Sequence, residues 1–250
     1  MLEWILTLSQ HSTQKGAKMD NSLSAYTQKY DKEGYGLQYP DGHVIRFYER
    51  ILKYKLSKTS GKLLDFGCGN GVHSKYFKNI TGGGIEPYGI DIVPSLKKVW
   101  EKDPCLDSKN FHIISPNSSF KKLFNTKMDF IFANQSLYYL TKQAFKEAVQ
   151  EFYELCNEGA IIFATMMSDK GYSMYERGEL MDNGLREVKG CPSGRLSGSS
   201  YIRFTKDIEE LKEDFKPFKP FKPLFWGDYE LINLYNFEGS VEHFIYIGQK

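Results

Sequence analysis

Three glycines at alternate positions, directly after a short apolar segment, constrain the fold of this chain most strongly. Residues 63–66 read Leu-Leu-Asp-Phe and lead straight into Gly67, Gly69 and Gly71, after which Val72 begins a stretch with helical character. A glycine-rich turn between a buried strand and a helix N-terminus lets a ligand approach the backbone, because no Cβ stands in the way. The sequence therefore predicts a ligand-binding turn between a strand and a helix.

The spacing of these glycines indicates what size of ligand the turn takes. Residues 67–71 have the pattern G-x-G-x-G, whereas the fingerprint of dinucleotide-binding enzymes is G-x-G-x-x-G. The closer spacing removes the room that a pyrophosphate needs and suits a smaller nucleoside ligand. An oxidoreductase with a nicotinamide cofactor is therefore disfavoured.

A second acid follows the glycines at a distance that fits ribose binding. Asp91 lies in the short apolar run Tyr88-Gly89-Ile90-Asp91-Ile92, about 20 residues after the last glycine. In a doubly wound sheet, an acid at the end of the second strand faces the ligand crevice and can accept hydrogen bonds from both ribose hydroxyls. The alternative is that Asp91 only caps a helix that starts near Leu96. The upstream glycine turn favours ribose binding.

The remaining patterns alternate between strand and helix. Strands are expected at 62–66, 87–92, 111–115, 128–134 and 160–165, with a closing hairpin at 229–234 and 241–247. Helical periods are expected at 44–56, 142–156 and 205–215, the last with Thr205 as its N-cap. This alternation means parallel strands joined by right-handed crossovers.

The acid at Asp65, the glycines and Asp91 together resemble motif I and the second-strand acid of the class I S-adenosylmethionine-dependent methyltransferases. The resemblance covers about residues 40–250 and is strongest from 62 to 140. It implies an α/β fold: a Rossmann-like, doubly wound, seven-stranded sheet of order 3-2-1-4-5-7-6, its last strand antiparallel, with helices on both faces and a small cap. It also implies S-adenosylmethionine as cofactor and S-adenosylhomocysteine as product.

The length of 250 residues fits one large domain. We expect residues 1–40 to form an N-terminal segment that partly covers the cofactor, and 41–250 to form the methyltransferase domain. A long stretch at about 166–204 is expected to be a cap insertion, because loops of this length are usually functional lids. The triple Phe-Lys-Pro repeat at 215–223 favours an extended spacer, with a ligand for a partner's aromatic groove as the alternative.

The resemblance assigns cofactor contacts to several segments. The expected cofactor-binding residues are Asp65, Gly67, Cys68, Gly69, Asn70, Gly71, Asp91, Ile92, Asn117, Ser118, Asn134, Gln135, Tyr39 and Arg46. Asn134 is expected to accept the ammonium of the methionine half through its side-chain or backbone carbonyl. Tyr39 and Arg46 are expected to bracket the carboxylate, which suits a guanidinium. Cys68 is interpreted as a small filler, and the adenine contact falls to Asn117 or Ser118.

Three residues are candidates to remove a proton from the methyl acceptor. His73 lies in the first turn of the helix after the glycines, His43 in the segment expected to fold over the cofactor, and Tyr138 in the segment after the fourth strand, where many relatives carry a histidine. Each has a simpler alternative, a solvated histidine or a tyrosine that packs a loop. An acceptor that is already an anion would need no base.

The cap stretch supplies the expected acceptor-binding residues, which are Tyr172, Tyr175 and Arg177. Arg195 and Arg203 follow them, and several cations aimed at one pocket would fit an anionic acceptor. A small-molecule acceptor is therefore the expected partner. Beyond the family, the segment 39–47, His73 and the segment 168–177 resemble methyltransferases encoded with bacterial surface-polysaccharide genes, including those suspected of methylating capsular phosphoramidate groups.

Composition and charge exclude several other classes of protein. The net charge of +2 creates no global field, so nucleic acid is not an expected partner. The four cysteines lack metal-ligand spacing and fit a reducing cytoplasm, so no metal is expected. No apolar run is long enough for membrane insertion. A monomer or a homodimer is expected, and a non-catalytic S-adenosylmethionine-binding module or a protein methyltransferase stays as the functional alternative.

Overall fold

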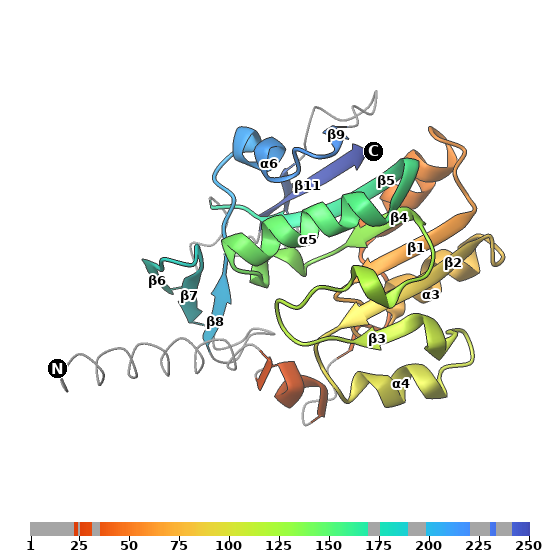
Figure 1. The fold of residues 1–250 in the computed structure, drawn as a ribbon, viewed down its shortest axis with the longest axis horizontal. Helices are drawn as coiled ribbons and strands as arrows, with labels where there is room; N and C mark the ends of the chain where they lie inside the picture. Colours follow the sequence, from red (N-terminus) through yellow and green to blue (C-terminus); the bar gives the residue numbers. More distant parts are fainter. Residues whose placement is uncertain are drawn as a thin grey trace.

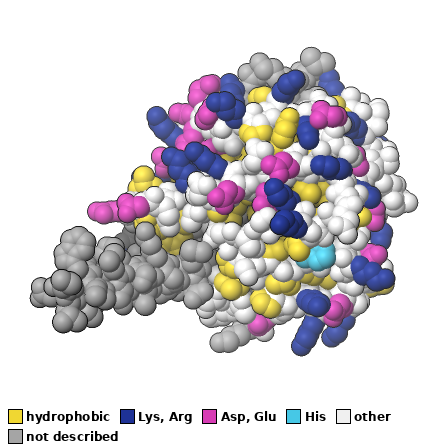
Figure 2. Space-filling model, viewed as in Figure 1, with side chains coloured by type: hydrophobic (Ala, Val, Ile, Leu, Met, Phe, Trp, Pro, Cys, Tyr) yellow, Lys and Arg dark blue, Asp and Glu magenta, His cyan; other side chains and the backbone are white. Residues whose placement is uncertain are grey.

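The computed structural model describes most of the chain. The described residues are 23–24, 26–31, 36–169, 176–189, 199–220, 231–233 and 242–250. No helix among these residues is both long and apolar enough to cross a membrane. On the face shown in Figure 2, the Lys and Arg side chains are interspersed with Asp and Glu, so this face has no patch of a single charge.

A mixed β-sheet forms the centre of the fold (Figure 1). Its strand order is β10-β11-β5-β4-β1-β2-β3, and the short β9 also pairs with β11. The strands are β1 (Gly61–Phe66), β2 (Ile85–Asp91), β3 (Phe111–Ile113), β4 (Met128–Ala133), β5 (Cys156–Met167), β9 (Lys219–Pro220), β10 (Leu231–Asn233) and β11 (Glu242–Gln249). β3, β2, β1, β4 and β5 run parallel, while β11 is antiparallel to β5. The predicted order 3-2-1-4-5-7-6 is confirmed, and β9 is an addition to it.

Helices cover both faces of this sheet. Figure 1 shows α5 (Lys142–Leu155) lying across the front face, with α6 (Ile208–Asp214) beyond its upper edge. The opposite face packs against α2 (Gly42–Arg46), the π-helix η1 (Phe47–Lys53) and α3 (Val72–Ile80), which share a hydrophobic cluster with the strands. α4 (Leu96–Lys102) packs near β3 at the edge of the sheet. Among the described residues, three single-turn 3-10 helices connect the larger elements: η2 (Ser108–Asn110), η3 (Lys121–Leu123) and η4 (Leu137–Tyr139).

The sequence pattern of α5 explains its packing. Its buried residues recur every three or four positions, as Ala144, Phe145, Ala148, Val149, Phe152 and Leu155 do. The hydroxyl of Thr141 accepts a hydrogen bond from the backbone N–H of Ala144, which satisfies one donor at the start of the helix. The helix therefore starts within the predicted range and buries one apolar stripe against β4 and β5.

The predicted cap insertion contains a second, smaller sheet. β6 (Glu176–Leu180), β7 (Arg186–Lys189) and β8 (Ser199–Ile202) pair antiparallel in sequence order. Figure 1 shows this small sheet apart from the main one, to the left of α5. The residue after β8, Arg203, donates its backbone N–H to the carbonyl of Tyr138 in η4 at 2.8 Å. This bond ties the small sheet to the segment that follows β4.

The prediction that Thr205 caps the next helix is wrong. Asp207 is the N-cap of α6, and its carboxylate accepts the backbone N–H of Glu210 at 2.9 Å. Thr205 is buried and its backbone N–H donates to the carbonyl of Met167, so it continues alongside β5. The backbone pairing with Met167 holds Thr205 outside the helix. The carboxylate of Asp207 therefore caps α6 in place of the hydroxyl of Thr205.

The prediction of an extended Phe-Lys-Pro connection is also wrong for residues 215–218. Phe218 donates its backbone N–H to the carbonyl of Phe215 at 2.9 Å, which closes a turn. Both phenylalanines are buried, and the ring of Phe215 stacks on Tyr246 with the centroids 4.4 Å apart. The repeat therefore begins with two core residues that fasten α6 to β11.

We expect Phe215→Ala to lower the free energy of unfolding by about 3–5 kcal/mol, because it removes a fully buried ring and leaves a cavity. Urea unfolding followed by circular dichroism measures the change. Lys216→Ala, one residue along and exposed, is the matched control and should stay within about 0.5 kcal/mol of the wild type. Equal unfolding midpoints for the Phe215→Ala variant and the wild type would contradict a core role for the repeat.

Candidate functional site

The glycine turn after β1 has the conformation that its sequence predicts. Gly67, Gly69 and Gly71 have φ angles of 73°, 53° and 77°, in the left-handed region that side chains disfavour. A Cβ on Gly67 would lie 2.5 Å from the Cβ of Ser136, and one on Gly69 would lie 2.6 Å from the hydroxyl of Tyr30. Gly71 is the N-cap of α3. The turn therefore presents backbone, not side chains, at the carboxyl end of β1.

Asp91 fastens this turn to the end of β2. Its Oδ2 accepts the backbone N–H of Gly69 at 2.9 Å, and its Oδ1 accepts those of Ile92 and Val93 at 2.7 and 3.1 Å. Burial raises the pKa of Asp91, and these three bonds oppose the rise. α4 takes Ser95 as its N-cap, so the alternative role of Asp91 as a helix cap is wrong. The carboxylate keeps accepting capacity on Oδ2.

Asp65 lies beneath the turn as an internal brace. It is almost fully buried and accepts the hydroxyl of Ser74 at 2.7 Å, which joins β1 to α3. Burial raises the pKa of Asp65 to about 6, against the opposing effects of His73 and Ser74. A buried acid with a raised pKa is typical of functional sites.

Cys68 and Asn70 complete the turn. Cys68 is buried, burial raises the pKa of its thiol well above the usual value, and its sulfur lies against Gly89 of β2. It packs as a filler there. The side-chain amide of Asn70 donates to the carbonyl of Leu37 at 2.9 Å, which fixes the chain ahead of α2 to the turn.

A polar network lies beside the turn at the end of β4. The amide nitrogen of Asn134 donates to Oδ2 of Asp41 at 2.9 Å, and the amide of Gln135 reaches the same oxygen at 3.3 Å. His43 pairs through Nε2 with the amide oxygen of Asn134 at 2.8 Å, and Thr165 donates to that oxygen at 3.4 Å. The side-chain oxygen of Asn134 is therefore engaged, and its backbone carbonyl is the better candidate to accept an ammonium.

Asp41 also meets the helix that follows the glycines. Nε2 of His73 lies 3.6 Å from its Oδ2, and His73 is itself buried. Burial alone would raise the pKa of Asp41, but the nearby imidazoles of His73 and His43 and the hydrogen bond from Asn134 lower it below its usual value. The anionic carboxylate of Asp41 therefore lies where three segments that are far apart in the sequence meet.

The predicted proton acceptors fall into two groups. His43 and His73 join the Asp41 network, and burial, the largest effect on His43, lowers its pKa. Tyr138 is buried in η4, where its ring lies 4.6 Å from that of Tyr139 and 5.5 Å from that of His243. All three side chains are therefore positioned at the carboxyl edge of the sheet.

Other predicted contacts lie further out. Tyr39 is 81% exposed and Arg46 is exposed. Asn117 and Ser118 are exposed after β3, where the hydroxyl of Ser118 donates to the carbonyl of Ser115 at 2.7 Å. Ile92 packs in the small cluster around Trp100. Tyr172, Tyr175 and Arg195 lie outside the described residues.

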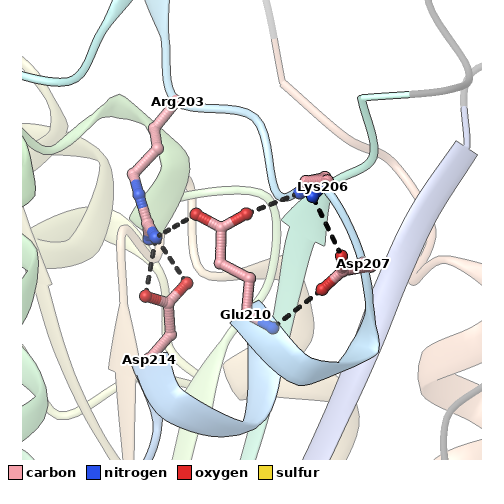
Figure 3. Close-up of polar contacts among 5 residues, drawn as sticks. All are labelled: Arg203, Lys206, Asp207, Glu210 and Asp214. Atoms are coloured by element: carbon pink, nitrogen blue, oxygen red, sulfur yellow. Dashed lines mark hydrogen bonds and ion pairs between the residues drawn. The ribbon is translucent and has the colours of Figure 1, made fainter.

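Two of the cations expected to face the acceptor, Arg203 and Arg177, have partners in the described part of the fold. Figure 3 shows the guanidinium of Arg203 turned toward α6, where it donates to both carboxylate oxygens of Asp214. Glu210 lies 3.4 Å from the same nitrogen, and the guanidinium also covers the ring of Phe145. Two acids thus balance the charge of Arg203 within the fold, and its part in an anion site stays a prediction. The guanidinium of Arg177 pairs with Asp169 at 2.6 Å and lies over the ring of Phe204.

Two functional candidates were missed from the sequence alone. Asp41 lies in the segment 39–47 but has no signal of its own there, and the partners of its carboxylate are more than 30 residues away along the chain. His243 interrupts an apolar strand pattern, which was the one available signal. No group of three potential metal ligands occurs in the part of the chain that the structure describes.

Comparison with known proteins assigns the chain to a family. Residues 38–195 match a family described as a methyltransferase domain. Because this match spans more than half of the 250 residues, the chain belongs to that methyltransferase family. An uncharacterized methyltransferase of Geobacillus thermodenitrificans (strain NG80-2) is 27% identical over 161 residues, which are 62% of this chain and 70% of that relative.

Solved structures of methyltransferases share the fold. The Burkholderia thailandensis 1,6-didemethyltoxoflavin-N1-methyltransferase, solved with 1,6-didemethyltoxoflavin and S-adenosylhomocysteine, has a TM-score of 0.60 and 14% identity, covering 96% of this chain and 89% of that one. A SAM-dependent methyltransferase from Methanosarcina mazei has a TM-score of 0.54 and 17% identity, covering 77% of this chain and 93% of that one. At these identities the likeness establishes the fold alone.

The raised pKa of Asp65 makes a prediction about stability and pH. The folded protein holds a proton on Asp65 that the unfolded chain has released, so this contribution is full below about pH 4 and is lost as the pH rises through about 6. We expect the free energy of unfolding of the Asp65→Asn variant, relative to that of the wild type, to rise by up to about 3 kcal/mol as the pH increases from 4 to 7. The amide still accepts the bond from Ser74. Urea unfolding at both pH values measures the difference.

The matched control is Asp129→Asn, which changes an acid at the opposite end of the sheet, beside the start of β1. Its difference from the wild type should vary less between the two pH values. A constant difference between Asp65→Asn and the wild type from pH 4 to 7 would contradict the assignment of a raised pKa to Asp65.

Proposed function

We propose that the chain is an S-adenosylmethionine-dependent methyltransferase that acts on a small molecule. The observation that carries this proposal is the left-handed glycine turn of β1 tied by Gly69 to the carboxylate of Asp91. It brings a turn without side chains and an acid that could accept the ribose hydroxyls together at the carboxyl edge of a doubly wound sheet, where such folds bind nucleosides. Membership of the methyltransferase family supports the same cofactor.

The described residues offer a partner for each part of this cofactor. Asp91 would accept the ribose hydroxyls through Oδ2, and Asn117 or Ser118 after β3 would approach the adenine. The methionine half would lie over residues 67–71, beside the positive N-terminus of α3. Its ammonium would meet the carboxylate of Asp41 and the carbonyl of Asn134. Asp41 is anionic and partly exposed, which fits a cation.

The remaining expected cofactor contacts stay part of the proposal. Tyr39 and Arg46 are exposed on and just before α2. An exposed guanidinium on this helix would need to turn toward the site to pair with the carboxylate of the methionine half. Tyr30 touches the glycine turn from the N-terminal side, which supports a cover formed by part of the segment 1–40.

The cofactor would supply an electrophilic methyl group, so the protein has to align the acceptor, exclude water and manage a proton. His43 is buried and its lowered pKa keeps it neutral at pH 7, with one ring nitrogen bonded to Asn134. His73 is held beside Asp41. Each histidine therefore helps to hold Asp41 in position, and each is also a candidate to take up the proton, as is Tyr138 in η4.

The acceptor is proposed to be a small molecule enclosed by the cap, with Tyr172, Tyr175 and Arg177 as its contacts. Because Arg203 and Arg177 are paired with acids, an anionic acceptor such as a phosphorylated precursor of a surface polysaccharide has less support than the sequence suggested. A neutral acceptor fits the described charges better.

Cys68, Cys105 and Cys156 form no disulfide among the described residues, which supports a reducing, cytoplasmic setting.

The cofactor proposal is tested by calorimetry with S-adenosylhomocysteine. We expect Asp91→Asn to weaken its binding by at least about tenfold, because one lost hydrogen bond to a charged group costs about 1.5–3 kcal/mol. The amide keeps the shape of the side chain. Asp107→Asn, an exposed acid beyond α4, is the control and should bind as the wild type does. Equal affinities for the Asp91→Asn variant and the wild type would refute the ribose role.

A further inference from the structure

His243 is a buried histidine that the network around Asp41 does not include. Its side chain is 2% exposed, and neither ring nitrogen has a hydrogen-bond partner among the described residues. Buried polar groups are nearly always hydrogen-bonded, because an unpaired one loses its bonds to water without replacement. A large polar ring left in this state costs stability, which is typical of residues kept for binding or catalysis.

The sheet places His243 beyond the methionine end of the proposed cofactor site. β4, β5 and β11 are consecutive strands, so β11 lies roughly 10 Å from β4 across the sheet. Ala133 at the end of β4 is level with Ala164, whereas His243 is level with Met167. The proposed nucleoside contacts lie on the other side of β4, at the ends of β1 and β2. His243 is thus on the side of the site where an acceptor would enter.

The neighbours of His243 are the other polar groups at this edge. The ring of Tyr138 in η4 lies 5.5 Å from its ring, with the planes inclined by 55°. His43 and Asp41, from α2 and the residue before it, are close enough to act on it electrostatically. Ile245 and Ile247 follow His243 on the same face of β11 and pack into the core beneath it. His243 therefore lies where the apolar core ends and the polar site begins.

We propose that His243 lies against the methyl acceptor and takes up its proton, so that the reacting group of the acceptor is a hydroxyl or an N–H. This rests on the proposed function, because it needs a methyl donor on the other side of the acceptor. The lone pair of the acceptor forms the new bond to the methyl carbon, the carbon–sulfur bond breaks with its electron pair on sulfur, and the acceptor proton moves to the imidazole. Water then removes that proton.

Charge acts on this arrangement in two opposing ways. Burial lowers the pKa of His243 to about 3, and nearby Asp41 opposes the fall, so the ring is neutral at pH 7 and only weakly basic. A neutral imidazole has one nitrogen that accepts a hydrogen bond and one that donates. Methyl transfer discharges the sulfonium as the imidazole gains a proton, so the site carries the same net charge before and after. Asp41 stabilises the new cation.

Chemical labelling tests whether a diffusible molecule reaches His243. The native full-length protein, saturated with S-adenosylhomocysteine, is treated with diethyl pyrocarbonate and its modified histidines are mapped by mass spectrometry. We expect modification at His243 despite its burial, because the route that admits an acceptor also admits a reagent of similar size. His112, partly exposed on β3, is the positive control for the reagent. Modification of His243 only after unfolding would overturn the proposal.

Two substitutions separate binding from structure. His243→Phe replaces the unpartnered ring with an apolar one of similar shape, and His243→Gln keeps a polar group. We expect at least one variant to melt at or above the temperature of the wild type and both to bind S-adenosylhomocysteine within about threefold of it. A fall in melting temperature for both variants would show that the histidine is structural and would overturn the proposal.

Turnover completes the test with a phenol, a primary alcohol and a primary amine as probe acceptors and release of S-adenosylhomocysteine as the readout. On a probe that the wild type methylates, we expect the stable variant to lose about 10²-fold or more in kcat, with an unchanged KM for S-adenosylmethionine. A rate within threefold of the wild type would overturn the proposal. If the wild type methylates none of them, the labelling result decides.

The failure of this inference differs from the failure of the proposed function. A wild-type protein that binds no S-adenosylhomocysteine in calorimetry would refute the methyltransferase cofactor site itself. If the protein binds S-adenosylhomocysteine but His243 does not react with diethyl pyrocarbonate, the proposed cofactor site stands and only the proposed role of the histidine is refuted.

Discussion

The carboxylate of Asp91 is the one side chain on which the geometry of the site depends. It accepts backbone N–H groups from both the glycine turn and the residues after β2, so it holds two strand ends in a fixed relation. Without this bond, the backbone N–H of Gly69 would be left unpaired in the turn. The glycine turn also determines where α3 begins and where the N-terminus of this helix points.

Asp41 performs a comparable task for the segments outside the sheet. It connects the start of α2, the first turn of α3 and the end of β4, three elements that share no local sequence signal. Asp65, which lies beneath them, is an acid whose burial disfavours its charged form. This burial costs stability, a cost that proteins tolerate at functional sites. The acids of the site thus give this edge of the sheet a charge that favours a cation, as the proposed sulfonium and ammonium would require.

The sequence predicts the parallel strands well, because apolar runs and the glycine turn are local patterns, and the resemblance to the methyltransferase family implies their order. It fails where distant pairing decides the structure. Thr205 pairs with the residue after β5 and leaves the cap to Asp207. Arg203 finds Asp214 on the next helix, and Phe215 finds Tyr246 on the last strand. The contacts of Asp41 and the isolation of His243 depend on tertiary packing in the same way, so no spacing rule could have identified them.

A crystal structure of the full-length protein with S-adenosylhomocysteine tests the central claim most directly. The account expects the ribose hydroxyls within hydrogen-bond distance of Asp91, the methionine half over residues 67–71, its ammonium at Asp41, and the sulfur facing the side of β5 and β11 where His243 lies. Electron density for the ligand at another edge of the sheet, or with its ribose away from Asp91, would contradict the account.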